Sequence, residues 1–206
     1  MAIELSSRAH LARAKEHAAA SDPHRLLYAA LELRLSIEAR LHDYAERAGE
    51  FIRIPDNVWQ IKELRKRVSS VFSASEKPLS LRLVNKKDKK KVEIFYVPVS
   101  THVQKIGQRL GDYLHSASLA KLSKPAQFDA FCELVKDGIM EMEFVHTGIL
   151  RGPPLQRGDG SITLSLEMGH QPEADALVSA VGDEALIEMR VVVTEKTPNG
   201  IKIRPA

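Results

Sequence analysis

The sequence has little cysteine, few aromatic residues and no long apolar run. A single cysteine, Cys132, among 206 residues excludes an intramolecular disulfide and a cysteine-based zinc cluster, and it is typical of a reducing cytosol. No apolar segment approaches the length of a membrane-spanning helix, and the first ten residues contain no hydrophobic leader. The composition therefore predicts a soluble, cytoplasmic protein that does not associate with membranes.

Several catalytic signatures are also missing. The segment 158–160 has neither the glycine spacing nor the following lysine of a phosphate-binding loop. The eight histidines are scattered, without a pair at metal-ligand spacing, and His10 and His17 are predicted to be solvated. Cys132 lies on an apolar helical face, which favours a core position over a nucleophilic one. The sequence therefore predicts no metal and no cofactor.

The charge balance does not identify a partner by itself. Thirty Lys and Arg residues against 27 Asp and Glu residues give a net charge of +3, which is too small to imply nucleic acid. The length of 206 residues allows one domain with a sizeable core, or a larger domain with a small appendage.

One long amphipathic segment, 25–48, is predicted to be the central helix. Asp22 can cap it and Pro23 suits its first position. Apolar residues recur in it at spacings of three and four: Leu26, Ala30, Leu33, Ile37, Leu41 and Tyr44. A polar row of Arg34, Glu38 and His42 interrupts this apolar surface. The row is either a site for an anion or a proton, or a structural Arg34–Glu38 pair with His42 at its rim.

Other segments complete an α+β fold. Helices are predicted at 3–20, 58–72, 101–117 and 125–139, and the segment 137–144 is ambiguous because Gly138 weakens a helix there. Strands are predicted at 79–84 and 92–99, which form a hairpin, and later at 161–168, 186–195 and 201–204, with a short helix at 175–181. We expect a helical bundle over 1–144 with the hairpin 79–99 inserted, and a β-rich segment, 145–206, packed on the bundle.

The tip of the predicted hairpin is strongly basic. Its lysines are Lys86, Lys87, Lys89, Lys90 and Lys91. Such a run can contact nucleic-acid phosphates without reading sequence. Lysines at a strand edge also keep a hairpin soluble and block edge pairing, and this second interpretation is favoured.

Arg109 and His115 on the predicted helix 101–117 are the main catalytic candidates. They lie less than two helical turns apart, so both side chains can face one side. A histidine that moves a proton and an arginine that stabilises phosphorane charge suit RNA cleavage without metal. The other interpretation is that His115 caps or packs near a helix end while Arg109 is solvated.

This Arg-x5-His motif on a late helix of a compact bundle resembles the HEPN superfamily, a group of prokaryotic helical proteins common in toxin–antitoxin and phage-defence systems. The resemblance covers roughly 1–120. It implies a homodimer in which two copies of the motif face each other and form one ribonuclease site. Arg109 and His115 would be its catalytic pair, and Glu38 or Glu32 the supporting acid. The alternative hypothesis is a non-catalytic protein-interaction or regulatory module.

Overall fold

The computed structural model shows an α+β fold with two compact units. The helical unit comprises Met1–Val71 and Val99–Glu143, and the sheet unit comprises Phe72–Pro98 and Phe144–Ala206. The structure describes residues 4–20, 22–48, 77–85, 89, 91–115, 120–152, 155–156, 162–167, 185–191 and 202–204. The helices predicted at 58–72 and 175–181 lie outside these residues.

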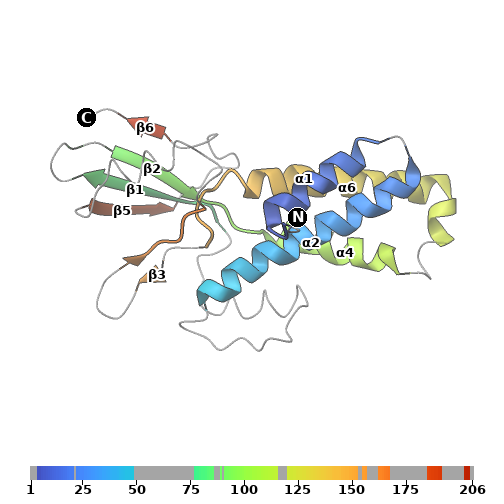
Figure 1. Cartoon of the computed structure of the whole chain (residues 1–206), viewed down its shortest axis with the longest axis horizontal. Coiled ribbons are helices and arrows are strands. Elements are labelled where there is room, and N and C mark those ends of the chain that lie inside the picture. Colours follow the sequence, from blue (N-terminus) through green and yellow to red (C-terminus); the bar gives the residue numbers. More distant parts are fainter. Residues whose placement is uncertain are drawn as a thin grey trace. The chain divides into compact units, whose positions relative to one another are not determined.

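The helical unit is built from long helices that the apolar periodicity predicted. They are α1 (Ser7–Ala18), α2 (Pro23–Ala48), α4 (Thr101–Leu114) and α6 (Pro125–Val145), with a short 3-10 turn at Ala120–Ser123 (Figure 1). The predicted cap of α2 is confirmed, and α4 also begins at a capping side chain. Asp22 Oδ1 accepts a hydrogen bond from His24 N at 2.9 Å, and Ser100 Oγ accepts one from Val103 N at 3.2 Å.

α2 is the central element of this unit, as predicted. It packs against both α1 and α4, and Leu33 also lies against α6. An ion pair between Lys15 and Glu143 joins α1 to α6. Fully buried aliphatic side chains of α2 meet those of α4 in the core: Leu33, Ile37, Leu41, Ile106 and Leu110. Removing this apolar surface from water is what holds the helices together.

The segment 137–144, which the sequence leaves ambiguous, is helical in the structure. α6 continues through Gly138 to Val145 and does not turn into strand. A Cβ atom at Gly138 would lie 2.7 Å from Leu33 Cδ2 and 2.9 Å from Ile106 Cγ2. The glycine therefore allows three helices to approach closely, and packing outweighs its weak helix propensity.

The sheet unit consists of an antiparallel sheet in the order β5-β1-β2-β6. Its strands are β1 (Leu79–Asn85), β2 (Lys91–Tyr96), β5 (Ala185–Val191) and β6 (Lys202–Arg204). The predicted hairpin is confirmed, with Leu81 opposite Ile94 on β2 and opposite Met189 on β5. A second, two-stranded sheet pairs β3 (Leu155–Gln156) with β4 (Ile162–Thr163).

The division into units differs from the predicted one. The hairpin does not belong with the helices, because β5 pairs with β1 and β6 pairs with β2. The C-terminal segment therefore completes the hairpin's own sheet. Both outer positions of that sheet are filled by strands that follow the hairpin by about a hundred residues, and such a pairing has no local sequence signal.

Among the described residues, no helix is both long enough and apolar enough to cross a membrane.

Candidate functional site

Two of the three residues in the polar row on α2 form an ion pair. Arg34 Nε donates a hydrogen bond to Glu38 Oε1 at 2.8 Å, and both side chains are half-buried. His42, the third residue of the row, is exposed. The structure therefore brings Arg34 and Glu38 together and leaves His42 at the rim, as the structural interpretation of this row predicted.

A glycine of α4 positions the Arg34 guanidinium. A Cβ atom at Gly111 would lie 2.5 Å from Arg34 Nη1 and 3.1 Å from Arg34 Cζ. The guanidinium thus lies directly against the backbone of α4, where any side chain at position 111 would displace it. The Arg34–Glu38 pair is thereby fixed beside the helix that carries the two catalytic candidates.

Arg109 and His115 are both exposed on α4. His115 is the C-cap residue, with an extended backbone at φ −73° and ψ 138°. At 3.6 residues per turn, six residues place the two side chains about 120° apart around the helix. Arg109 is also about 160° from Gly111, on the side away from Arg34. Within one chain, the two residues do not share one side of α4.

Most of the predicted lysine cluster lies outside the described residues. Lys89 is exposed, and its φ of 59° is left-handed, which fits a tight turn. Lys91 begins β2. Lys86, Lys87 and Lys90 are not among the described residues.

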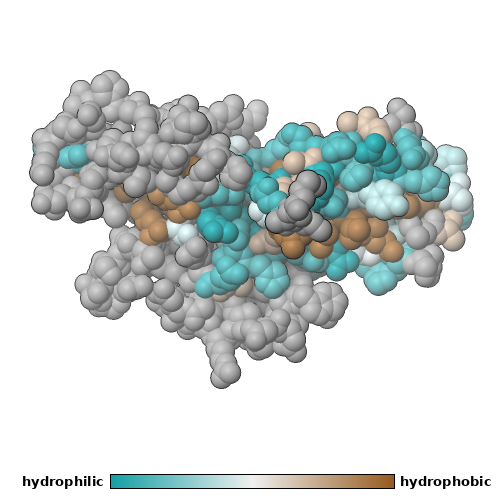
Figure 2. All heavy atoms as spheres, in the orientation of Figure 1, coloured by the Kyte–Doolittle hydropathy of each residue, from teal (hydrophilic) through white to brown (hydrophobic). Residues whose placement is uncertain are grey.

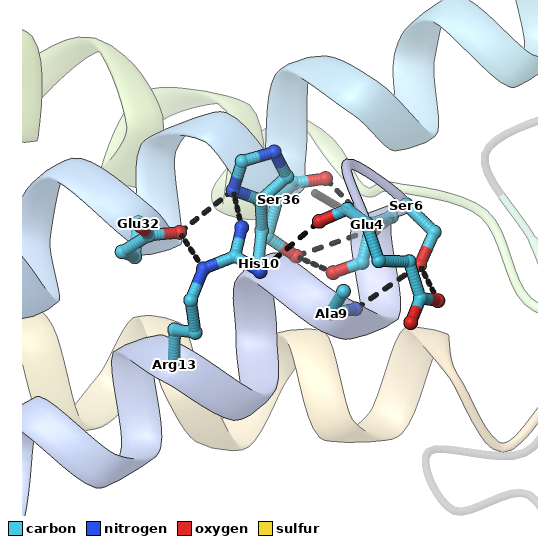
Figure 3. A network of polar contacts seen from close by, with 8 residues as sticks. Glu4, Ser6, Ala9, His10, Arg13, Glu32 and Ser36 are labelled. Atoms are coloured by element: carbon cyan, nitrogen blue, oxygen red, sulfur yellow. Dashed lines mark hydrogen bonds and ion pairs between the residues drawn. The ribbon is translucent and has the colours of Figure 1, made fainter. Parts of the chain in front are cut away.

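A second polar network, which the sequence did not predict, joins α1 to α2 (Figure 3). His10 Nδ1 lies 2.7 Å from Glu32 Oε2, and Arg13 Nε lies 3.0 Å from the same oxygen. The prediction that His10 is solvated is wrong, since the residue is only 7% exposed. One signal was available, because Ser7, His10 and Ala14 follow the spacing of a single buried face of α1.

The electrostatics of this network favour the charged carboxylate. Burial raises the pKa of Glu32, but hydrogen bonds from Arg13 and His10, together with their positive charge, outweigh burial and lower the pKa below its usual 4.5. Arg13 Nη2 also lies 2.7 Å from His10 Nδ1. A ring nitrogen holds at most one proton, so Nδ1 either donates to Glu32 or accepts from Arg13. The residues satisfy one another, which is typical of a structural network.

The same helix contact contains a reciprocal serine pair. Ser7 Oγ donates to Ser36 O at 2.8 Å, and Ser36 Oγ donates to Ser7 O at 2.7 Å. Both residues are buried. Two side-chain hydrogen bonds therefore fix the spacing of α1 and α2 at the start of α1, next to the His10–Arg13–Glu32 cluster (Figure 3).

Another side of α2 carries exposed apolar residues, although the ring of Tyr28 there lies against His17 of α1, with ring centroids 5.6 Å apart. Tyr28 is 57% exposed and Leu31 43% exposed, and Leu35, one turn further along, is half-buried. We call these three residues the α2 face. Figure 2 shows apolar side chains along the middle of the visible surface of the helical unit, bordered by hydrophilic ones. Neighbouring exposed apolar residues on one helix face are typical of an interaction surface.

A small cavity of about 240 Å³ lies where α1, α2 and α6 meet, in the helical unit. Its wall includes Leu26, Phe128 and Cys132. Burial, followed by the negative charge of Asp129, raises the pKa of the Cys132 thiol, although Lys136 opposes this. A raised pKa keeps the thiol protonated and weakly reactive, as expected of a packing residue.

Among the described residues, no group of three or more His, Cys, Asp and Glu side chains is arranged to hold a metal ion.

Comparison with known proteins does not assign the chain. No family model, no curated protein and no solved structure matches it. The resemblance to the HEPN superfamily therefore stays a prediction that rests on the Arg109–His115 motif and on the helical bundle.

Proposed function

We propose that this protein is an interaction module that binds a protein partner through the α2 face. The observation that carries the proposal is the exposure of Tyr28 and Leu31 on the central helix of the unit. A central helix normally buries its apolar residues against neighbours, and apolar positions on the core side of α2, such as Leu33 and Ile37, are fully buried. A partner would remove the remaining apolar surface from water.

The charged groups nearby favour binding over catalysis. Arg34 is engaged by Glu38, and His10 and Arg13 are engaged by Glu32. Arg109 and His115 lie on different sides of α4. An enzyme needs its acid, base and charge-stabilising groups within reach of one reacting atom. The described residues of the helical unit therefore support a binding surface more directly than a catalytic site.

The experiment compares tagged wild type, Leu31→Glu and Met140→Glu, each recovered from the native host under identical conditions. Met140 is 59% exposed on α6, so it provides a matched control outside the α2 face. A specific partner should be retained by wild type and Met140→Glu but lost with Leu31→Glu. Equal recovery by all three proteins would reject the α2 face as the binding surface.

A second candidate function is metal-independent RNA binding or cleavage by a HEPN-like dimer in a defence or toxin–antitoxin system. It is favoured by the close approach of Arg34 to Gly111, which fixes Glu38 beside the helix that carries Arg109 and His115. Two copies would have to face each other to bring an arginine and a histidine to one phosphodiester. The lysines of the hairpin tip would add sequence-independent phosphate contacts.

A ribonuclease assay in excess chelator tests this second candidate. His102 is exposed at the other end of α4, so His102→Ala is the matched control for His115→Ala. Catalysis by His115 predicts that cleavage falls by at least about a hundredfold in His115→Ala and is unchanged in His102→Ala. Absence of cleavage in wild type, or equal rates in all three proteins, would reject the ribonuclease.

A further inference from the structure

The cavity where α1, α2 and α6 meet has an apolar interior and a charged rim. In its wall, Val135 is buried, and Leu26 and Phe128 are half-buried. The charged residues Asp22 and Lys136 also line it and are exposed, so the cavity is open to solvent there. An apolar cavity of about 150 Å³ can bind benzene. The volume of about 240 Å³ is therefore enough for a ring with a short side chain.

The two charges at the rim differ in what already neutralises them. Lys136 Nζ donates a hydrogen bond to Glu133 Oε1 at 2.8 Å, so its charge is balanced within α6. Asp22 Oδ1 accepts a hydrogen bond from the backbone N–H of His24 at 2.9 Å. None of the ion pairs between described residues includes Asp22. The carboxylate of Asp22 is therefore the charge at the rim that a ligand can neutralise.

The surroundings of Cys132, in the same wall, also favour positive charge. Burial is the main cause of the raised pKa of its thiol, and the negative charges of Asp129 and Glu133 act in the same direction, whereas Lys136 opposes them. The helix dipoles offset each other, because the C-terminal end of α1 and the N-terminal end of α2 both line the cavity. Negative charge therefore exceeds positive charge around the cavity.

We propose that this cavity binds a small organic cation that has an apolar body and one ammonium group. The apolar body enters between Leu26 and Phe128, and the ammonium group stays at the rim beside the carboxylate of Asp22. Removal of the apolar body from water supplies most of the affinity. The charge pair is exposed to water, so it adds selectivity more than strength. The inference does not depend on the α2 face, since none of the three residues of that face lines the cavity.

The thiol in the wall of the cavity reports its occupancy. Cys132 is the single cysteine of the chain, so its rate of reaction with a neutral dipyridyl disulfide is measured without interference. Three probes share a phenyl ring and differ in charge: phenethylamine, phenethyl alcohol and phenylacetate. Saturating phenethylamine should slow the reaction of the wild type at least about fivefold. Half of this protection should need about two- to fivefold less phenethylamine than phenethyl alcohol, and phenylacetate should be the weakest probe.

A change of charge at the rim tests the class of ligand. Asp22→Asn removes the carboxylate but keeps the fold, because asparagine caps a helix as well as aspartate does. This variant should bind phenethylamine and phenethyl alcohol equally well. Asp112→Asn removes an exposed carboxylate of α4 that does not line the cavity, so it should keep the wild-type preference. An amine preference that persists in Asp22→Asn, or equal protection of the wild type by all three probes, overturns the cationic ligand.

A change of volume tests the place of the site. Ala18→Leu adds three carbon atoms in the wall of the cavity and should raise the concentration of each probe that gives half protection at least about fivefold. Ala126→Leu adds the same atoms at an exposed position of α6 and should leave it unchanged. Circular dichroism checks that both variants keep their helices. Equal protection in the two variants overturns the location, and no protection of the wild type up to about 10 mM probe overturns the site itself.

Discussion

Alanine should be tolerated better at one helical glycine of this protein, Gly111 in α4, than at another, Gly138 in α6. In both helices, alanine is favoured over glycine by up to about 1 kcal/mol because it restricts the unfolded chain and shields the backbone. This gain is similar at the two positions. The difference between the variants therefore reports what the new methyl group meets in the folded state.

At Gly138 the methyl group meets atoms that cannot move away. It would lie 2.7 Å from Leu33 Cδ2 and 2.9 Å from Ile106 Cγ2, both in side chains that are almost fully buried. Carbon atoms pack best at about 3.5–4.0 Å, so the helices must separate. Overpacking of this kind costs about 1–3 kcal/mol, and Gly138→Ala should therefore be neutral to about 2 kcal/mol less stable than wild type.

At Gly111 the methyl group would lie 2.5 Å from Arg34 Nη1, which is at the end of a flexible and partly exposed side chain. Rotation of Arg34 relieves the contact and weakens its pair with Glu38, which costs a few tenths of a kcal/mol. Gly111→Ala should therefore be as stable as wild type or slightly more stable. The two variants should differ by about 1–3 kcal/mol, with Gly111→Ala the more stable.

Urea unfolding followed by circular dichroism at 222 nm measures this difference, because the helical unit dominates the signal. A difference of 1 kcal/mol corresponds to roughly 2–4 °C in the melting temperature of a chain of this size. Equal stabilities, or a more stable Gly138→Ala, would show that α2, α4 and α6 do not meet closely at Gly138.

Three further predictions concern single polar groups. The folded state lowers the pKa of Glu32 below 4.5, so its carboxylate stabilises the fold above that pH, and the contribution is lost as the pH falls through the folded-state pKa. The free energy of unfolding of Glu32→Gln should therefore be about 1–3 kcal/mol lower than that of wild type at neutral pH. Measured in urea, it should also change less than the wild-type value as the solution is acidified through this range. An equal change would contradict the ion pairs of Glu32. Ser36→Ala removes the hydrogen bond to Ser7 O and should lower the free energy of unfolding by about 1–2 kcal/mol in the same assay. An unchanged free energy of unfolding would contradict the serine pair. Alkylation of Cys132 by iodoacetamide in mildly alkaline buffer should be slower than that of free cysteine, because its pKa is raised, and an equal or faster rate would contradict its burial.

The apolar periodicity of the sequence determined most of the helical unit. The three- and four-residue spacing in 25–48 predicted a central helix, and Asp22 predicted where α2 begins. These features are local, because a cap and an amphipathic face are properties of consecutive residues. The Arg34–Glu38 pair was predictable for the same reason, since its two members lie one turn apart.

The tertiary structure decided what depends on residues far apart in the chain. The pairing of β5 and β6 with the hairpin, the passage of α6 through Gly138 and the burial of His10 against Glu32 all involve contacts across tens of residues. No local pattern encodes such contacts, because many partners satisfy the same apolar or charged group. Sequence alone therefore predicted the four long helices that the structure describes, and only packing showed that Tyr28 and Leu31 stay exposed while Leu33 and Ile37 are buried.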